Sequence, residues 1–443
     1  MSDTTEPFAL QDVPEPNLYR EQFSYSQLPR VQFDGQTVPM EPAAEFWITD
    51  TTFRDGQQAR PPYTVQQIVD LYRLLSELDG GSGLIRQSEF FLYSNKDREA
   101  VDRCRELARP YPEVTGWIRA AKSDFRLVKE MQLAETGILT SCSDYHIFLK
   151  LRKSRRQAAE QYLDIVRAAL DEGIRPRCHF EDITRADFHG FVVPFAVELM
   201  RLRDEYGIDV KIRLCDTMGY AVPWAQASLP RSVPRLVHGM IHEAGVPGEL
   251  LEWHGHNDFH KVLINPATAW LHGCAACNGS LLGIGERTGN TPIEGMVIEH
   301  AQLRGQSEKV RYPVITEIAE YYQNEIGYSV PTNFPLVGRD FNTTRAGIHA
   351  DGLTKSDEIY SCFDTETILR RPIGVAITDK SGAAGIKHWI DKVYGTNLAK
   401  DDARLQAIRQ KVDAEFEFGR TTAISDEEMY AWYAEVFGQA ETP

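Results

Sequence analysis

The chain has 443 residues, of which 42% are hydrophobic and 25% are charged, as in ordinary globular proteins. This composition excludes a mainly disordered, collagen-like or disulfide-packed chain. An excess of 64 acidic over 48 basic residues gives a formal charge of −16, which disfavours nucleic acid as a partner.

The apolar runs are short, and none reaches the ~18 residues needed to cross a bilayer, so no membrane partner is expected. Residues 1–16 have neither the basic start nor the apolar stretch of a secretory signal. Seven cysteines, an odd and scattered set, fit reduced thiols. We therefore expect a cytoplasmic protein.

Residues 1–45 are rich in proline, glutamine and acidic side chains, and they predict an extended arm that packs on the main body. After this arm, short β-branched or apolar runs alternate with longer amphipathic segments, which is typical of repeated βα units. Strands are expected at 46–52, 84–90, 115–120, 137–141, 175–180, 209–215, 251–256 and 280–284. The expected helices include 65–78, 154–172, 188–206 and 225–244.

Eight βα units in about 250 residues predict an α/β fold of the closed (β/α)8 type, a TIM barrel, over residues 46–325. Gly283 and Gly285 interrupt the eighth expected strand. Residues 326–443 predict a smaller, mainly helical C-terminal region, with helices at 402–418 and 426–437.

In such barrels the active site lies at the carboxyl ends of the strands. Every expected strand end here carries polar or ionisable side chains, which packing alone would not produce. They include Arg54, Asp55, Gln58, Glu89, Arg119, His146, His179, Glu181, Thr217, His254, His256, Arg287 and Asn290.

The sharpest local feature is the pair His254 and His256. Residues two apart on a strand point to the same side, so both imidazoles face one point, with Asp55 available across the barrel. An isolated pair of this kind is more often a pair of exposed or core histidines, but the carboxylate and the strand end favour a divalent metal. Nitrogen and oxygen ligands suit Mn²⁺, Mg²⁺, Zn²⁺, Co²⁺ or Fe²⁺ without choosing among them. Mn²⁺ is our first expectation.

Arg54 precedes Asp55 and is expected to stabilise negative charge that develops on a substrate oxygen. An ordinary ion pair between these neighbours is the alternative, but adjacent strand residues point to opposite faces, so Asp55 is expected to be a poor partner for Arg54.

Glu181 is a candidate for proton transfer. A salt bridge from Glu181 to Arg185 is the competing interpretation, and Asp182 is the other carboxylate that Arg185 could use.

These residues resemble the DRE-TIM metallolyases, a family of metal-dependent Claisen-condensing barrels and related lyases. The resemblance covers residues 49–58 (TDTTFRDGQQ), 254–258 (HGHND) and 283–290 (GIGERTGN), three separate motifs in the family's order. Residues 346–352 (AGIHADG) resemble a segment found in the synthases of the family and absent from its lyases. The resemblance spans about residues 46–390.

The resemblance implies a role for each matching position. The metal ligands would be Asp55, His254 and His256, with Asn290 as a further ligand or close neighbour. Arg54 would polarise a 2-oxo acid, and Thr217 would hold its carboxylate. Glu181 and His349 would take part in proton transfer. His349 would reach a partner subunit's site, which implies a homodimer. Acetyl-CoA would be the second substrate.

Two departures from the family pattern point to one branch. Residues 259–263 (FHKVL) replace a small apolar run, and His179-Phe180 replaces a Ser-Pro pair. Both resemble the branch of Re-citrate synthase and 2-phosphinomethylmalate synthase. The short stretch after Ile390 also leaves no room for the leucine-feedback domain of long isopropylmalate synthases.

The acceptor is expected to be dianionic, because cationic or donor groups replace the apolar pocket that an isopropyl group needs. The expected substrate contacts are Gln58, Arg119, His146, His179 and Thr217. Arg119 could instead pair with Glu89 or Asp144 and touch no substrate. We therefore expect condensation of acetyl-CoA with oxaloacetate to citrate. Alternatives are a 2-phosphinomethylmalate or 2-phosphonomethylmalate synthase, a homocitrate or 2-isopropylmalate synthase, a retro-aldol lyase, or a non-catalytic binding barrel.

Overall fold

The structure is a computed structural model that describes residues 10–438. The chain divides into two compact units, one ending at Arg311 and the other beginning at Tyr312. Within the described residues, no helix is long and apolar enough to span a membrane.

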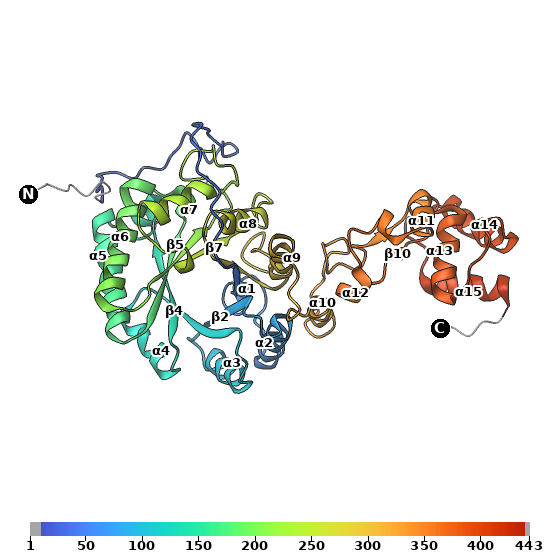
Figure 1. Ribbon diagram of the computed structural model, residues 1–443, viewed down its shortest axis with the longest axis horizontal. Coiled ribbons are helices and arrows are strands. Elements are labelled where there is room, and N and C mark those ends of the chain that lie inside the picture. The colour runs from blue at the N-terminus through green and yellow to red at the C-terminus, as the bar shows by residue number, and fades with distance from the viewer. Residues whose placement is uncertain (1–9, 439–443) are drawn as a thin grey trace, which may run out of the picture. The chain divides into compact units, whose positions relative to one another are not determined.

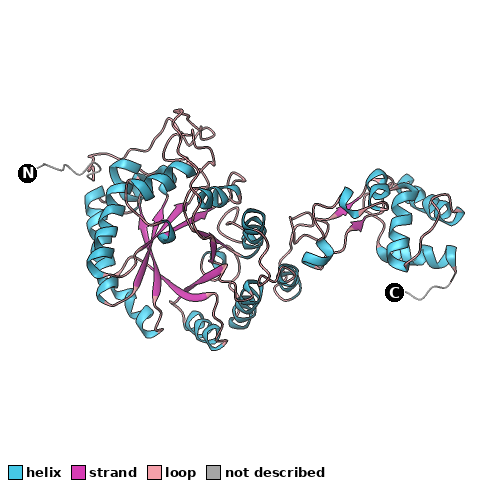
Figure 2. Cartoon of the chain, viewed as in Figure 1, coloured by secondary structure: helices cyan, strands magenta, loops and turns pink. Residues whose placement is uncertain are grey.

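Eight parallel strands of the first unit close into a barrel, with helices on the outside (Figure 1 and Figure 2). Each strand pairs with the next, and Ile48 of the first strand lies opposite Ile85 on one side and Cys277 on the other, which closes the barrel. The TIM-barrel prediction is confirmed. The strands are β1 (Trp47–Asp50), β2 (Ile85–Phe91), β3 (Glu113–Ile118), β4 (Glu135–Ser141), β5 (Arg175–Glu181), β6 (Lys211–Asp216), β7 (Leu251–Gly255) and β8 (Ala276–Gly279).

The outer helices start and stop where the sequence places caps. Thr64 caps the helix Val65–Asp79 and exchanges hydrogen bonds with Gln67, and Gly80 ends it at φ +61°, a conformation that favours glycine. The α-helices of this unit are α1 (Asp55–Gln58), α2 (Val65–Asp79), α3 (Asn95–Glu106), α4 (Phe125–Glu130), α5 (Arg155–Asp171), α6 (Val193–Tyr206), α7 (Val233–His242), α8 (Ile264–Leu271) and α9 (Ile293–Arg304). Two π-helical segments, η2 (Tyr145–Lys150) and η4 (Phe188–Val192), precede α5 and α6.

Two expected elements are wrong. The eighth strand is Ala276–Gly279 and not 280–284, because Leu282 and Gly283 take left-handed φ values of +55° and +62° and form a tight turn. The helix expected at 225–244 begins only at Val233, because Pro230 cannot donate a backbone hydrogen bond and restricts the residue before it.

The middle of the barrel is ionic rather than apolar. Glu89, Glu135 and Glu252 face Arg177, Arg213 and Lys211, so that three acids meet three bases. Both arginines are fully buried, and each contacts two or more of the carboxylates at 2.9–3.6 Å. The usual barrel interior consists of branched apolar layers. This one is held by fixed charges directly beneath the carboxyl ends of the strands.

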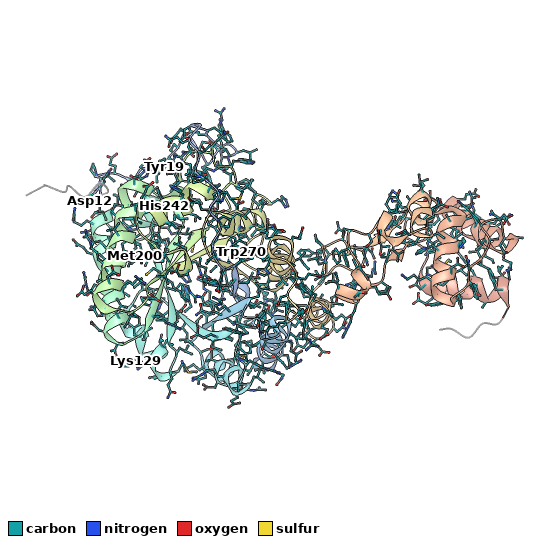
Figure 3. All side chains as sticks on the ribbon, viewed as in Figure 1. Asp12, Tyr19, Lys129, Met200, His242 and Trp270 are labelled. Atoms are coloured by element: carbon teal, nitrogen blue, oxygen red, sulfur yellow. The ribbon has the colours of Figure 1, made fainter. Side chains whose placement is uncertain are left out.

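The described part of the arm runs along the outside of the barrel and is held at two places. The backbone N–H of Asn17 donates to Asp144 at 2.7 Å, and the hydroxyl of Tyr145 donates to the Leu18 carbonyl at 2.7 Å. Further along the arm, Asp34 pairs with Arg235 at 2.7 Å. Figure 3 marks Asp12 and Tyr19 on this arm.

The second unit is mainly helical and has an apolar core of its own. Thr316 of its first helix donates to the Leu369 carbonyl at 2.6 Å, so this helix belongs to the second unit, and the unit starts earlier than the expected residue 326. Its elements are α10 (Val314–Asn324), β9 (Thr343–Thr344), α11 (Gly347–Leu353), α12 (Thr365–Leu369), β10 (Gly374–Val375), α13 (Gly382–Tyr394), α14 (Ala403–Glu417) and α15 (Asp426–Phe437).

Candidate active site

Three predicted metal ligands come together at the barrel mouth. Asp55 opens α1 just after β1, His254 lies on β7, and His256 follows it. The Nε2 atoms of the two histidines are 3.2 Å apart, and they lie 3.8 and 3.7 Å from the Asp55 carboxylate. All three side chains are buried.

The protonation of His254 is fixed by its other neighbour. His254 Nδ1 lies 2.7 Å from the Asn278 side-chain oxygen, while the Asn278 amide nitrogen donates to Thr49 Oγ1 at 2.9 Å. The Asn278 amide orientation is thereby set, so Nδ1 of His254 carries the proton. The Nε2 lone pair is left facing Asp55, as metal-binding imidazoles require.

The donor set fits a divalent cation. Ligand bonds of about 2.0–2.2 Å bring neighbouring donor atoms to roughly 3 Å, close to the spacing seen. Asn290 donates to Asp55 Oδ2 at 2.6 Å, and its own Oδ1 is buried with no partner among residues 10–438. Reversing that amide would turn its oxygen toward the carboxylate cluster and add a fourth ligand.

The electrostatics hold this cluster in the state that a cation needs. Burial raises the pKa of Asp55, but Arg54 and the two imidazoles outweigh burial and hold that pKa well below its usual range. Burial and the neighbouring His256 lower the pKa of His254 to about 4. The site thus presents an ionised carboxylate and a neutral imidazole at neutral pH.

Arg54 differs from its expectation in one respect. Its Nη1 lies 3.0 Å from Asp55 Oδ1, although the sequence argument made this pairing a poor one. The argument failed because β1 ends at Asp50 and Asp55 begins a helix, so strand alternation does not apply. The guanidinium also lies 4.6 Å from the Trp117 ring, and its Nε is buried without a partner in the described chain.

Glu181 ends β5 and is surrounded by donors. It accepts from the Ser141 hydroxyl and from Lys150 Nζ at 3.1 Å, and His146 Nδ1 lies 2.9 Å away. Burial raises the pKa of Glu181, but His146 and Lys150 outweigh it and lower the pKa to about 2. Arg185 pairs with Asp182 at 2.9 Å, so the competing salt bridge to Glu181 does not form.

Two expected substrate contacts line the same mouth. Thr217 follows β6, and its hydroxyl accepts from the Asp182 backbone at 2.9 Å. His179 on β5 is buried, with Nε2 3.3 Å from Glu89, and burial lowers its pKa to about 3. A Cβ on Gly137 of β4 would lie 2.7 Å from both His179 Nε2 and Glu89 Oε1, so glycine is needed there.

Two predicted site residues of the barrel unit, Arg119 and Gln58, are not brought to this cluster, and His349 belongs to the other unit. Arg119 is 69% exposed and pairs with Asp124 at 3.0 Å, a carboxylate that neither sequence interpretation named. Gln58 is exposed at the end of α1. His349 lies in the second unit, where Thr344 contacts its Nδ1 and the Tyr360 ring lies 4.3 Å away.

The structure adds three side chains that the sequence argument missed. Lys150 is four residues after His146 on η2, a spacing that could have predicted their common face. Asn278 was missed because the eighth strand was expected too late in the chain. Trp117 lies on β3 with its indole nitrogen buried and without a partner among the described residues, a feature that only coordinates reveal.

Comparison with known proteins decides the family. The HMGL-like family model matches residues 45–321. The chain belongs to the HMGL-like family. It is 60% identical over 96% of its length to a citrate (Re)-synthase of Syntrophus aciditrophicus, covering 68% of that protein, and 51% identical over 95% to that of Clostridium kluyveri, covering 94%. A 2-phosphinomethylmalate synthase of Streptomyces hygroscopicus is 36% identical over 98% of this chain and 99% of its own length.

Solved structures support the fold. The HMG-CoA lyase of Bacillus subtilis superposes with a TM-score of 0.52 at 19% sequence identity, over 66% of this chain and 97% of the lyase. That similarity supports the barrel fold and no finer property. The family resemblance drawn from the three sequence motifs is therefore confirmed. The similarity to Re-citrate synthase and 2-phosphinomethylmalate synthase, drawn from the two departures, is confirmed as well.

Proposed function

We propose that the chain condenses acetyl-CoA with oxaloacetate to form citrate and CoA, with a divalent cation at the barrel mouth. The observation that carries this proposal is the cluster of Asp55, His254 and His256 beside Arg54, in a chain 51–60% identical to two citrate (Re)-synthases. A carbon–carbon bond forms between the acetyl methyl carbon and the keto carbon of oxaloacetate. Water then cleaves the thioester.

Asp55, His254 and His256 would hold the cation, with Asn290 as a fourth ligand. The cation supplies Lewis-acid polarisation of a ketone. Arg54 places its guanidinium beside the same point, where it stabilises the charge that develops on the keto oxygen. Thr217 would bind the carboxylate next to the ketone.

Glu181, at the end of β5, accepts the proton that leaves the acetyl methyl group as the carbon–carbon bond forms. Its depressed pKa keeps it ionised in the resting enzyme, ready to accept a proton but weakly basic. Because His146 and Lys150 hold it in that state, loss of either contact on substrate binding would raise its basicity. These two residues therefore set the proton affinity of the base and position its carboxylate.

A charged acceptor is favoured over an apolar one by the lining of the mouth. Arg54 Nε and Trp117 Nε1 are buried nitrogens without a hydrogen-bond partner in the described chain, and His179 Nε2 has the Glu89 carboxylate 3.3 Å away. Unsatisfied buried donors are costly, and an anionic substrate group would satisfy them. An isopropyl group would leave them unpaired.

We further propose Mn²⁺ as the metal, a homodimer in which His349 acts at the site of the partner subunit, and a cytoplasmic location. Six of the seven free cysteines are buried, which suits a reducing compartment. The Thr344 hydroxyl at His349 Nδ1 leaves Nε2 of His349 as the ring nitrogen that would exchange the proton.

The test is CoA release from acetyl-CoA with Mn²⁺, comparing oxaloacetate, 2-oxoglutarate, 2-oxoisovalerate, pyruvate and phosphonopyruvate. We expect the highest kcat/KM with oxaloacetate and citrate as product. A higher kcat/KM with 2-oxoisovalerate would refute the dianionic acceptor, and one with phosphonopyruvate would move the enzyme to phosphorus-containing acceptors. The His179→Leu variant should lower kcat/KM for oxaloacetate about tenfold or more.

A further inference from the structure

A surface cavity of about 510 Å³ lies between the arm and the loop that joins β4 to α5. Asp12, Val13 and Pro14 form its arm side, and Asp12 is labelled in Figure 3. Phe148, Arg152, Lys153 and Ser154 form its barrel side. This volume is in the range of pockets that hold small-molecule ligands.

The loop concentrates positive charge in a chain whose net charge is −16. Five of the seven residues from Lys150 to Arg156 are lysine or arginine. Two of them are neutralised, since Lys150 contacts Glu181 and the buried Arg155 is held by Asp144 and Asp187. The other three are Arg152, Lys153 and Arg156, and none forms an ion pair with a side chain in the described part of the protein.

Among the residues that line the cavity, Arg152 and Lys153 are the cations and Asp12 is the one acid. Asp12 accepts a long hydrogen bond, 3.4 Å, from the Arg156 backbone. Lys153 donates to the neutral amide oxygen of Gln161. The cavity therefore keeps a local excess of positive charge, which attracts anions.

The backbone of Arg152 has an unfavourable conformation. Arg152 has φ +55°, in the left-handed region that suits glycine or asparagine. The turn around it is fixed by hydrogen bonds from Leu151 N to the His146 carbonyl and from Lys153 N to the Ile147 carbonyl. These hydrogen bonds hold the backbone of Arg152 at the edge of the cavity.

The same loop carries the active-site contacts. His146 and Lys150 touch the Glu181 carboxylate, and Arg152 follows two residues later. A substrate with its reacting end at Glu181 and an anionic far end would span both places. Half-buried Phe148 adds an aromatic surface to the cavity, on which a purine ring can stack.

We propose that this cavity binds the adenosine 3′-phosphate 5′-diphosphate end of acetyl-CoA. Arg152 and Lys153 contact the phosphates, Phe148 lies against the adenine, and the arm forms the opposite wall. This inference rests on the proposed function, because acetyl-CoA is the substrate assigned there. It also gives the arm a part in substrate binding.

The test compares the double variant Arg152→Asn, Lys153→Gln with a control, Lys129→Gln, Arg167→Gln. Asparagine tolerates the left-handed backbone, and the control removes two exposed cations elsewhere on the barrel unit. We expect the first pair to raise KM for acetyl-CoA about tenfold at unchanged kcat. Turnover of acetyl-pantetheine, which lacks the nucleotide, should be the same in both variants and wild type.

Adenosine 3′,5′-bisphosphate serves as the second probe. It should inhibit wild type competitively against acetyl-CoA, and about tenfold more weakly in the double variant. Unchanged KM, an equal loss with acetyl-pantetheine, or non-competitive inhibition (a separate nucleotide site) would each overturn the proposal. If wild type releases no CoA with any 2-oxo acid, the proposed function fails. Calorimetric titration of CoA into wild type and variant then still decides the cavity.

Discussion

The two units of this protein solve the problem of a stable interior in opposite ways. The barrel unit buries three carboxylates with two arginines and a lysine beneath its active site. The second unit buries apolar side chains such as Ile386, Ile390 and Leu405. Within its described part Lys387 is the one lysine, arginine, aspartate or glutamate that is buried, and it pairs with Asp391. Only the buried charges of the barrel unit fix an electric field at the barrel mouth, where the candidate active site lies.

The charged interior continues directly into the site. Glu89 accepts hydrogen bonds from Arg213 at 2.9 Å and from Arg177 at 3.1 Å, and it lies 4.0 Å from Arg54 Nε. Arg54 in turn pairs with Asp55, so the network holds in place the groups that stabilise developing charge. An apolar core could support the fold but could not orient these charges.

The largest expected effect is on catalysis by the barrel unit. The His254→Ala variant should lower kcat/KM for CoA release by about 10³-fold or more, because the cation loses a ligand. Metal content measured on the purified protein should fall in parallel, while the melting temperature of the second unit stays constant. His272→Ala is the control, since that ring follows α8 and bonds to the Thr268 carbonyl of that helix, not to the ligand cluster. Full metal content in the His254 variant would contradict the assignment.

The next effect is on the stability of the ionic interior. Replacing Arg177 with methionine leaves Glu89 and Glu135 buried with one partner fewer each, and we expect the free energy of unfolding to fall by about 3–5 kcal/mol. Denaturant unfolding measures it. Arg86→Met is the control, because that arginine pairs with the exposed Glu45 and such pairs contribute about 0–1 kcal/mol. Equal losses in the two variants would show that the buried network is not what holds the barrel.

Sequence reasoning predicted the barrel well because short candidate strands alternate regularly with longer amphipathic helical segments, although strands such as β2, β5 and β6 also carry charged side chains. It placed Asp55, His254 and His256 together from strand order alone. It failed at β8, where a left-handed Leu282 has no sequence signal, and that error hid Asn278. It also misplaced Arg119, since a partner five residues along, Asp124, depends on a turn after β3 that periodicity does not reveal.

The apolar second unit should respond to loss of volume instead of loss of charge. Ile408 is fully buried, and Ile408→Ala should destabilise that unit by about 2–4 kcal/mol. Differential scanning calorimetry should show the loss in one transition, with the barrel transition unmoved. Leu303→Ala, a partly exposed leucine on α9 of the barrel unit, should change neither transition by more than about 0.5 kcal/mol. A single transition that shifts as a whole would mean that the two units unfold together.

The smallest expected effect distinguishes the buried charges of the barrel from the more exposed charges of the second unit by how their contributions to stability respond to pH and salt. Burial opposes ionisation in the barrel, but Arg213 and Arg177 outweigh it and lower the pKa of Glu252 to about 2. A lowered pKa means stability that is complete above the unfolded value of about 4.3 and is lost as pH falls toward 2.

In the second unit the Arg404 hydrogen bond lowers the pKa of Asp402 to about 2, but that carboxylate is partly exposed to solvent, whereas Glu252 is buried. Salt near 1 M screens exposed charges far more than buried ones. Between pH 4.3 and 2, salt should therefore flatten the pH dependence of the second transition and leave that of the barrel. Calorimetry across this range, with and without salt, measures both slopes. If salt flattens the barrel slope as much as the other, solvent reaches the ionic interior, and the Arg54 site cannot be the rigid, preorganised one inferred from its contacts.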